Sequence, residues 1–368
     1  MIHDTAATCW GRSTAAMMAA AWLAAWAPAG AWAADPVEGV LYTATAKSGI
    51  QCEVVAVSPA EVEIIRGDKS EKIGVERIDQ LSFPAEPDAL KDARSALRRG
   101  EPDQALEELG RIEAGEFEGL PQLVLDEHEY LKAAAAGGRA VGGGEHLAAG
   151  EKAVRDYLAK HAGSHHFFPM QELLATLLAR SGKFAAAAEA LAPLDRGPPT
   201  FRVRAATGRA GLLFDQQKYA EAQREFAAAA QMPTDPQDAA STAQKRSAEV
   251  GQARCLGRLG KPAEAVAAIN KIIDQSAPTD DGLLGQAYNA LGDIHRAAGQ
   301  DQDAIIAFLT VDLVYNGNED AHAETLFNLA QLWDARQSPP RAKKARQSLN
   351  DLYPASLWAK KTPVTPER

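Results

Sequence analysis

Residues 288–308 read YNALGDIHRAAGQDQDAIIAF, and this stretch decides how the chain folds. Apolar residues recur at three- and four-residue spacing on both sides of Gly299, which is the pattern of two amphipathic helices joined by a short turn. Gly292 and Ala304 are small, so we expect them to face each other where the two helices cross. Larger side chains surround this contact: Tyr288, Leu291 and Phe308. The stretch therefore predicts a close-packed helical hairpin.

The same pattern recurs along residues 87–360. Each unit breaks at a Gly or Gln, and an alanine follows five residues later. The breaks are Gly100, Gly182, Gln217, Gly260, Gly299 and Gln337. The matching alanines are Ala105, Ala187, Ala222, Ala265, Ala304 and Ala342. A period of roughly 35–43 residues is typical of stacked helical hairpins. The pattern predicts about seven hairpins; the second is irregular, and we expect a glycine-rich break in it between Ala136 and Glu145.

These units resemble the tetratricopeptide repeat family. The residues that carry the resemblance in 288–308 are joined in the last unit by Leu329, Ala330, Trp333, Ala342 and Pro354. The resemblance implies a mainly α fold, a right-handed superhelical array of antiparallel helical hairpins. It also implies that the first helix of each hairpin lines a concave groove, and that the partner is a protein or a peptide.

Residues 37–83 differ from the rest, because short β-branched runs alternate there with turn residues. Strands are expected over 39–46, 50–57, 62–65, 71–75 and 78–83. Their number and spacing resemble a small five-stranded β-barrel of the Sm or Src-homology-3 kind. Since the barrel and the array pack by different rules, we expect residues 87–368 to fold without residues 37–83.

The first 33 residues have the layout of a secretory signal peptide. An apolar run over residues 15–27 follows Arg12, Pro28 ends it, and Ala31-Trp32-Ala33 offers small residues for cleavage. We expect an exported protein of the periplasm or cell envelope, with no membrane span after signal removal and possible peripheral envelope association. An uncleaved anchor is the alternative. Residues 361–368 are predicted to be a disordered tail.

Composition narrows the function class. The net charge is −10, hydrophobic residues make up 46% of the chain, and alanine is the commonest residue. An acidic, helix-rich chain is not typical of a nucleic-acid binder. We find no nucleophile elbow, phosphate-binding loop or dinucleotide fingerprint, and we predict no catalytic residue and no cofactor. His161, His165 and His166 cluster in one stretch, but no ligand spacing accompanies them, and we assign no metal ligand.

The repeat register places a mixed set of side chains on the groove. The candidate residues are Arg204, Arg254, Arg258, Asn289, Asp293, Arg296, Phe327 and Gln331, with Arg180 and Asp215 on or near the same face. Guanidinium groups beside polar and aromatic surface suit an extended peptide or an anionic segment. The alternative is a solvated helix face without a partner.

The C-terminal end of the array is basic. Lys343 and Lys344 could orient an acidic partner, or they could belong to a polar cap on the last repeat. The sequence thus favours an exported non-enzymatic scaffold that binds protein or peptide partners. An accessory subunit of a cell-envelope assembly or cell-wall machine is the alternative, and an enzyme with an unrecognised site is a minor one.

Overall fold

The computed structural model describes residues 35–43, 48–141, 144–234, 238–354 and 356–361. The predicted signal peptide lies outside these residues, as does the predicted tail except for Lys361, which ends a helix instead. Within the described part of the chain, no helix combines the length and the apolar character needed to cross a bilayer.

A five-stranded antiparallel sheet comes first. Its strands are β1 (Val37–Thr43), β2 (Ile50–Val57), β3 (Glu61–Arg66), β4 (Lys69–Gly74) and β5 (Ile78–Ser82). Their order is β4-β3-β2-β1-β5, so the first strand lies between β2 and β5 and pairs with both. The five predicted strands are confirmed. Since β4 and β5 are the edges of this sheet, the closed barrel stays a prediction.

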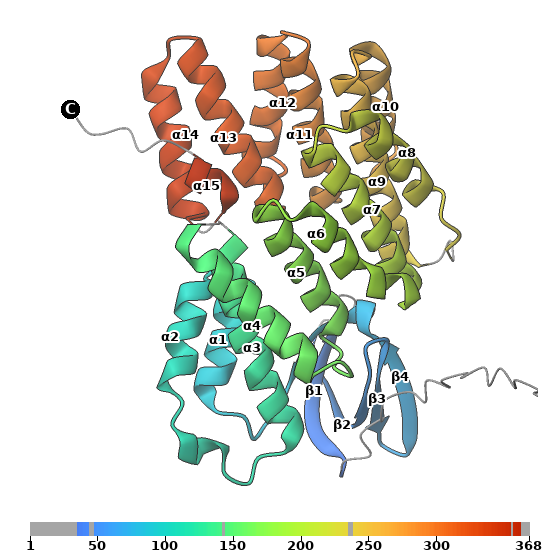
Figure 1. Ribbon diagram of the computed structural model, residues 1–368, viewed down its shortest axis with the longest axis vertical. Helices are drawn as coiled ribbons and strands as arrows, with labels where there is room; N and C mark the ends of the chain where they lie inside the picture. Colours follow the sequence, from blue (N-terminus) through green and yellow to red (C-terminus); the bar gives the residue numbers. More distant parts are fainter. Residues whose placement is uncertain (1–34, 44–47, 142–143, 235–237, 355, 362–368) are drawn as a thin grey trace, which may run out of the picture. The chain divides into compact units, whose positions relative to one another are not determined.

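Fifteen α-helices follow in the described residues (Figure 1). They are α1 (Asp88–Arg98), α2 (Pro102–Arg111), α3 (Gln122–Val141), α4 (Leu147–Lys160), α5 (Phe167–Arg180), α6 (Phe184–Leu191), α7 (Pro199–Asp215), α8 (Tyr219–Ala230), α9 (Ala239–Arg258), α10 (Pro262–Asp274), α11 (Asp281–Ala297), α12 (Asp301–Leu313), α13 (Glu319–Ala335), α14 (Pro339–Leu352) and α15 (Leu357–Lys361). Each odd-numbered helix from α1 to α13 packs against the even-numbered helix after it. These pairs form seven helical hairpins among the described residues, and the second of them is α3 with α4.

The predicted breaks are the turns inside the hairpins. Four are glycines with φ between 71° and 77°, while Gln217 and Gln337 take the same left-handed conformation at 61° and 55°. This conformation costs a residue with a Cβ atom about 1 kcal/mol. The six matching alanines are all fully buried. The repeat register read from the sequence is therefore correct.

One prediction about the glycines is wrong, and another stays a prediction. A Cβ atom on Gly292 would lie 2.5 Å from the Phe308 ring, so Gly292 packs closely on Phe308, while its approach to Ala304 stays a prediction. The helix α3 continues through Gly137 and Gly138 to Val141, so the break in the second hairpin is shorter than expected. At Gly137 a Cβ atom would lie 2.6 Å from Leu173 on α5. This glycine serves a close helix contact, which the sequence pattern cannot distinguish from a turn.

The sheet and the first helices share one hydrophobic core. Leu41, Val54 and Leu81 from the strands belong to the same buried cluster as Leu90 of α1 and Val124 of α3. Removing the sheet would expose the helical half of this cluster to water. The expectation that the array folds without the sheet therefore does not follow from this packing. Further along the chain, smaller clusters join each hairpin to the next, as in stacked repeats.

Candidate functional site: a basic cavity on the first helices

A cavity of about 540 Å³ lies on the first helices of successive hairpins. Its lining comes from α5, α7, α9, α11, α13 and the terminal helix α15. The lining residues are Arg180, Phe214, Asp215, Arg254, Arg258, Asp293, Arg296, Ala297, Glu324, Asn328, Leu357, Trp358 and Lys361. The predicted groove residues Arg254, Arg258, Asp293 and Arg296 are thus brought together.

Helix α15 adds a wall that does not belong to any hairpin. It packs on α13 and α14 through Ala359, which shares a buried cluster with Leu326 and Leu349. The Trp358 ring lies 5.1 Å from the ring of Phe327, and the Lys361 ammonium lies 4.6 Å from the Trp358 ring. These contacts hold the end of the described chain against the cavity.

Arg254 lies at the centre of an ion-paired cluster in the cavity lining. Its guanidinium forms ion pairs with Asp293 on α11 and with Glu324 on α13, the second at 2.8 Å. Asn289 donates a hydrogen bond of 2.6 Å to the other oxygen of Glu324. Burial raises the pKa of the Glu324 carboxyl, although the adjacent Arg254 acts in the opposite direction. The cluster ties three consecutive first helices together, so Arg254, Asp293 and Asn289 hold the cavity in shape.

Arg180, Arg258 and Arg296 also line the cavity, and none of them forms a close ion pair with a described carboxylate. Arg180 and Arg258 form no hydrogen bond or ion pair with any residue that the structure describes. Arg296 donates to the neutral side chains of Asn328 and Gln331. Five cationic side chains line the cavity against three carboxylates, and Arg254 uses two of these carboxylates. The cavity is therefore net positive in a chain of net charge −10.

Loss of hydration at the charged groups also favours the binding of an anion in this cavity. Protein atoms around Arg180 remove water from its guanidinium and lower its pKa, which Asp215 and Asp320 only partly offset. The Asp215 side chain still reaches solvent, yet the cavity walls take away part of its hydration and raise its pKa. A partly dehydrated cation without a hydrogen-bonded partner favours the approach of an anion.

The remaining predicted site residues lie elsewhere. Arg204 forms an ion pair with Glu172, outside the cavity lining. Phe327 supports α15 through Trp358, and Gln331 accepts from Arg296, so both stand behind the lining. Lys343 and Lys344 are exposed on α14 and do not line the cavity.

Sequence reasoning missed Glu324 and Asn328 of α13 and the whole of α15. Glu324 and Asn328 follow the helical spacing of the groove face, so the register could have included them. Nothing in the sequence of residues 357–361 shows that this short helix turns back toward the cavity. Its position depends on packing against α13, a contact that a periodic pattern does not encode.

No family model matches this chain, and no curated protein matches its sequence. Solved structures do align with it. A tetratricopeptide repeat protein from Parabacteroides merdae ATCC 43184 is 17% identical and covers 73% of this chain and 97% of its own, with a TM-score of 0.45. NprR in complex with its cognate peptide NprX is 12% identical and covers 74% of this chain and 82% of its own, with a TM-score of 0.44. Tetratricopeptide repeat proteins are thus among the structural neighbours of this chain.

Proposed function

We propose that this protein is a non-enzymatic scaffold that binds a protein partner through a peptide carrying a carboxylate, with that carboxylate held in the basic cavity. The observation that carries the proposal is the pair Arg180 and Arg258. Both line the cavity, and neither forms a hydrogen bond or a close ion pair with a described residue. Guanidinium groups bind carboxylates through paired, charge-assisted hydrogen bonds.

The shape of the site fits an extended ligand. Its lining runs across five consecutive first helices, so a peptide lying over them would meet one helix after another. Phe214 and Trp358 offer aromatic surface beside the cations. Such surface takes up apolar side chains of a peptide, while the guanidinium groups fix its acidic end.

A peptide array tests the proposal. The probe is a set of random peptides printed once with free C-terminal carboxylates and once amidated, and the wild-type chain is expected to select acidic members. In the variant with Arg180→Glu and Arg258→Glu, binding should fall by about 100-fold, because two charge-assisted contacts of about 1.5 kcal/mol each are lost. Amidation abolishes binding if the C-terminal carboxylate is the anchor, and leaves it unchanged if an acidic side chain is.

The variant with Lys343→Glu and Lys344→Glu is the matched control. It makes the same change of charge on exposed residues of α14, outside the cavity. It should bind like wild type. Equal losses in both variants would show that only net charge matters, and an array without any wild-type binder would count against the proposal.

We also propose that the protein acts outside the cytoplasm, in the periplasm or cell envelope. The apolar run over residues 15–27 and the small residues of Ala31-Trp32-Ala33 support this. N-terminal sequencing of the protein made in a bacterial host is expected to start near Ala34. A chain that keeps Met1 in the membrane fraction would overturn cleavage.

A further inference from the structure

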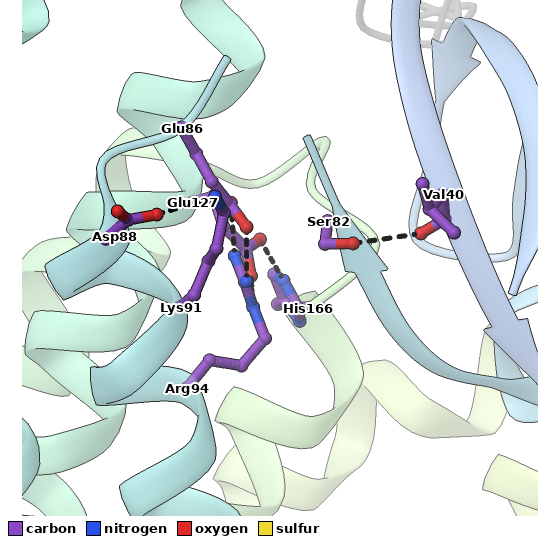
Figure 2. Close-up of polar contacts among 8 residues, drawn as sticks. All are labelled: Val40, Ser82, Glu86, Asp88, Lys91, Arg94, Glu127 and His166. Atoms are coloured by element: carbon purple, nitrogen blue, oxygen red, sulfur yellow. Dashed lines mark hydrogen bonds and ion pairs between the residues drawn. The ribbon is translucent and has the colours of Figure 1, made fainter. Parts of the chain in front are cut away.

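A second polar cluster shares no residue with the lining of the basic cavity. The loop between α4 and α5 carries His165 and His166, and His166 is the N-cap residue of α5. The His166 ring lies within hydrogen-bond distance of Glu127 of α3, nearly forty residues earlier in the chain. A ring nitrogen of His165 lies within 4.8 Å of the same carboxylate. Figure 2 shows His166 directed at Glu127, with Arg94 of α1 on the other side of the carboxylate.

His165 is the unexplained member of this cluster. Its residue is only 5% exposed, and neither ring nitrogen has a hydrogen-bond partner among the described residues. Burial, together with the neighbouring His166, lowers the pKa of His165 to about 3, so its ring is neutral near pH 7. A buried imidazole without partners is costly. A neutral imidazole with a free lone pair is also the form that binds metal ions.

Glu127 supplies an anionic oxygen beside this ring. Burial acts to raise its pKa, but the nearby His166 and Arg94 outweigh burial and hold the pKa at about 2. One carboxylate oxygen accepts from Arg94 Nε at 3.3 Å, and the other lies 2.8 Å from His166 Nε2. The carboxylate is thus ionised and fixed in orientation.

The surrounding contacts hold the other groups in place. Arg94 donates two hydrogen bonds of 2.8 Å to Glu86, which offsets its charge. The Tyr130 ring stacks on the ring of His166 at a centroid distance of 3.4 Å. This network accounts for Glu127 and His166, which lie within hydrogen-bond distance of each other. It leaves His165 without a role.

We propose that Glu127, His165 and His166 form a binding site for a divalent transition-metal cation with the ligand preferences of Zn²⁺. One donor atom from each residue lies within 4.8 Å of the others. Bonds of about 2.0–2.1 Å to a tetrahedral ion place ligand atoms about 3.3 Å apart, so side-chain movements of about 1 Å close the site. Two imidazoles and one carboxylate suit Zn²⁺ better than the hard cations Ca²⁺ and Mg²⁺.

The ion has a route into the site and an open position there. A cavity of about 230 Å³ is lined by all three residues and also by Asp126, His161 and Ser164. Three protein ligands leave a fourth position of a tetrahedral ion free for water. A bound ion would join α3 to the loop that begins the third hairpin, and would therefore stabilise the fold.

Metal titration of the full chain without a histidine tag tests this site. After treatment with a chelator, the wild-type protein is expected to bind one equivalent of Zn²⁺ in calorimetry and to melt at a higher temperature with Zn²⁺ than without it. The decisive variant is His165→Phe. It removes a ligand but also removes the unpartnered nitrogens, so the metal-free protein should melt no lower than wild type while its Zn²⁺ affinity falls by about 100-fold or more.

The matched control is His128→Gln, on the same helix as Glu127, where the ring of His128 packs on Phe117 at 4.5 Å. It should keep full affinity. Co²⁺ bound to the wild type should show the strong visible absorption of a four-coordinate ion, a readout that needs no variant to fold. The proposal is overturned if the wild type takes up no Zn²⁺ at micromolar concentration, or if His165→Phe binds Zn²⁺ as tightly as wild type.

Discussion

Replacing Phe308 with alanine is expected to lower the free energy of unfolding by about 3–5 kcal/mol. The ring is fully buried in the cluster that joins α12 to α13, and it also fills the space above Gly292 on α11. Its removal leaves a cavity at the centre of the sixth hairpin and at its junction with the seventh. Urea unfolding followed by helical circular dichroism measures the loss.

Two further variants make this test specific. Ile306→Ala on the same helix changes a residue that is 58% exposed, and should shift stability by no more than about 0.5 kcal/mol. Gly292→Ala alone should destabilise, because its Cβ would overlap the Phe308 ring. In the double variant the new methyl group enters the space that the ring has left, so the two losses should add to less than their sum. Strict additivity would show that Gly292 and Phe308 do not touch.

Replacing Arg254 with alanine is expected to cost about 3 kcal/mol. The change leaves Asp293 and Glu324, whose side chains are only 9% and 15% exposed, as neighbouring carboxylates without their shared cation. Breaking such a cluster on one side costs more than the net contribution of the intact cluster, because the buried charges that remain lack a partner. The midpoint of urea unfolding reports the change.

Arg258→Ala is the control for Arg254, since Arg258 follows one helical turn later on α9, is exposed and makes no ion pair with a described residue. Its effect on stability should stay within about 0.5 kcal/mol. In the Arg254→Ala background, Glu324→Gln should restore part of the stability, because one of the two uncompensated charges is removed. If Arg254→Ala unfolds at the same urea concentration as Arg258→Ala, the ion-paired cluster does not support the fold.

Local features of the fold could be predicted from the sequence. The turn residues inside the hairpins adopt a left-handed conformation, and the position five residues later has room only for a small side chain. Both requirements restrict the residue type at a fixed spacing, so the sequence pattern reveals them. The strands alternate with turn residues and were predicted closely for the same reason. The glycines of α3 could not be interpreted in this way. Gly137 is small because Leu173 approaches it from α5, and the residues before and after it do not reveal that neighbour.

The sites depend more strongly on distant contacts. The register could place Arg254, Arg258, Asp293 and Arg296 on one face, because consecutive first helices repeat at a regular interval. The register could not predict that α15 lies at that face. The register also could not predict that Glu127 lies beside His165 and His166, because this contact depends on how the loop after α4 folds over α3. The histidines were noticed as a run, but their carboxylate partner lies nearly forty residues away.

The hydrophobic cluster shared by the sheet and α1 to α3 determines how the molecule opens. Buried groups of this cluster come from both sides, so neither side can separate from the other without exposing both to water. Amide protons of β2 and α3 are therefore expected to exchange with solvent through one common opening. The hairpins after α9 rest on smaller clusters, each shared only between neighbouring elements, so they can open a few at a time. Unfolding should start at the C-terminal hairpins and reach the sheet last.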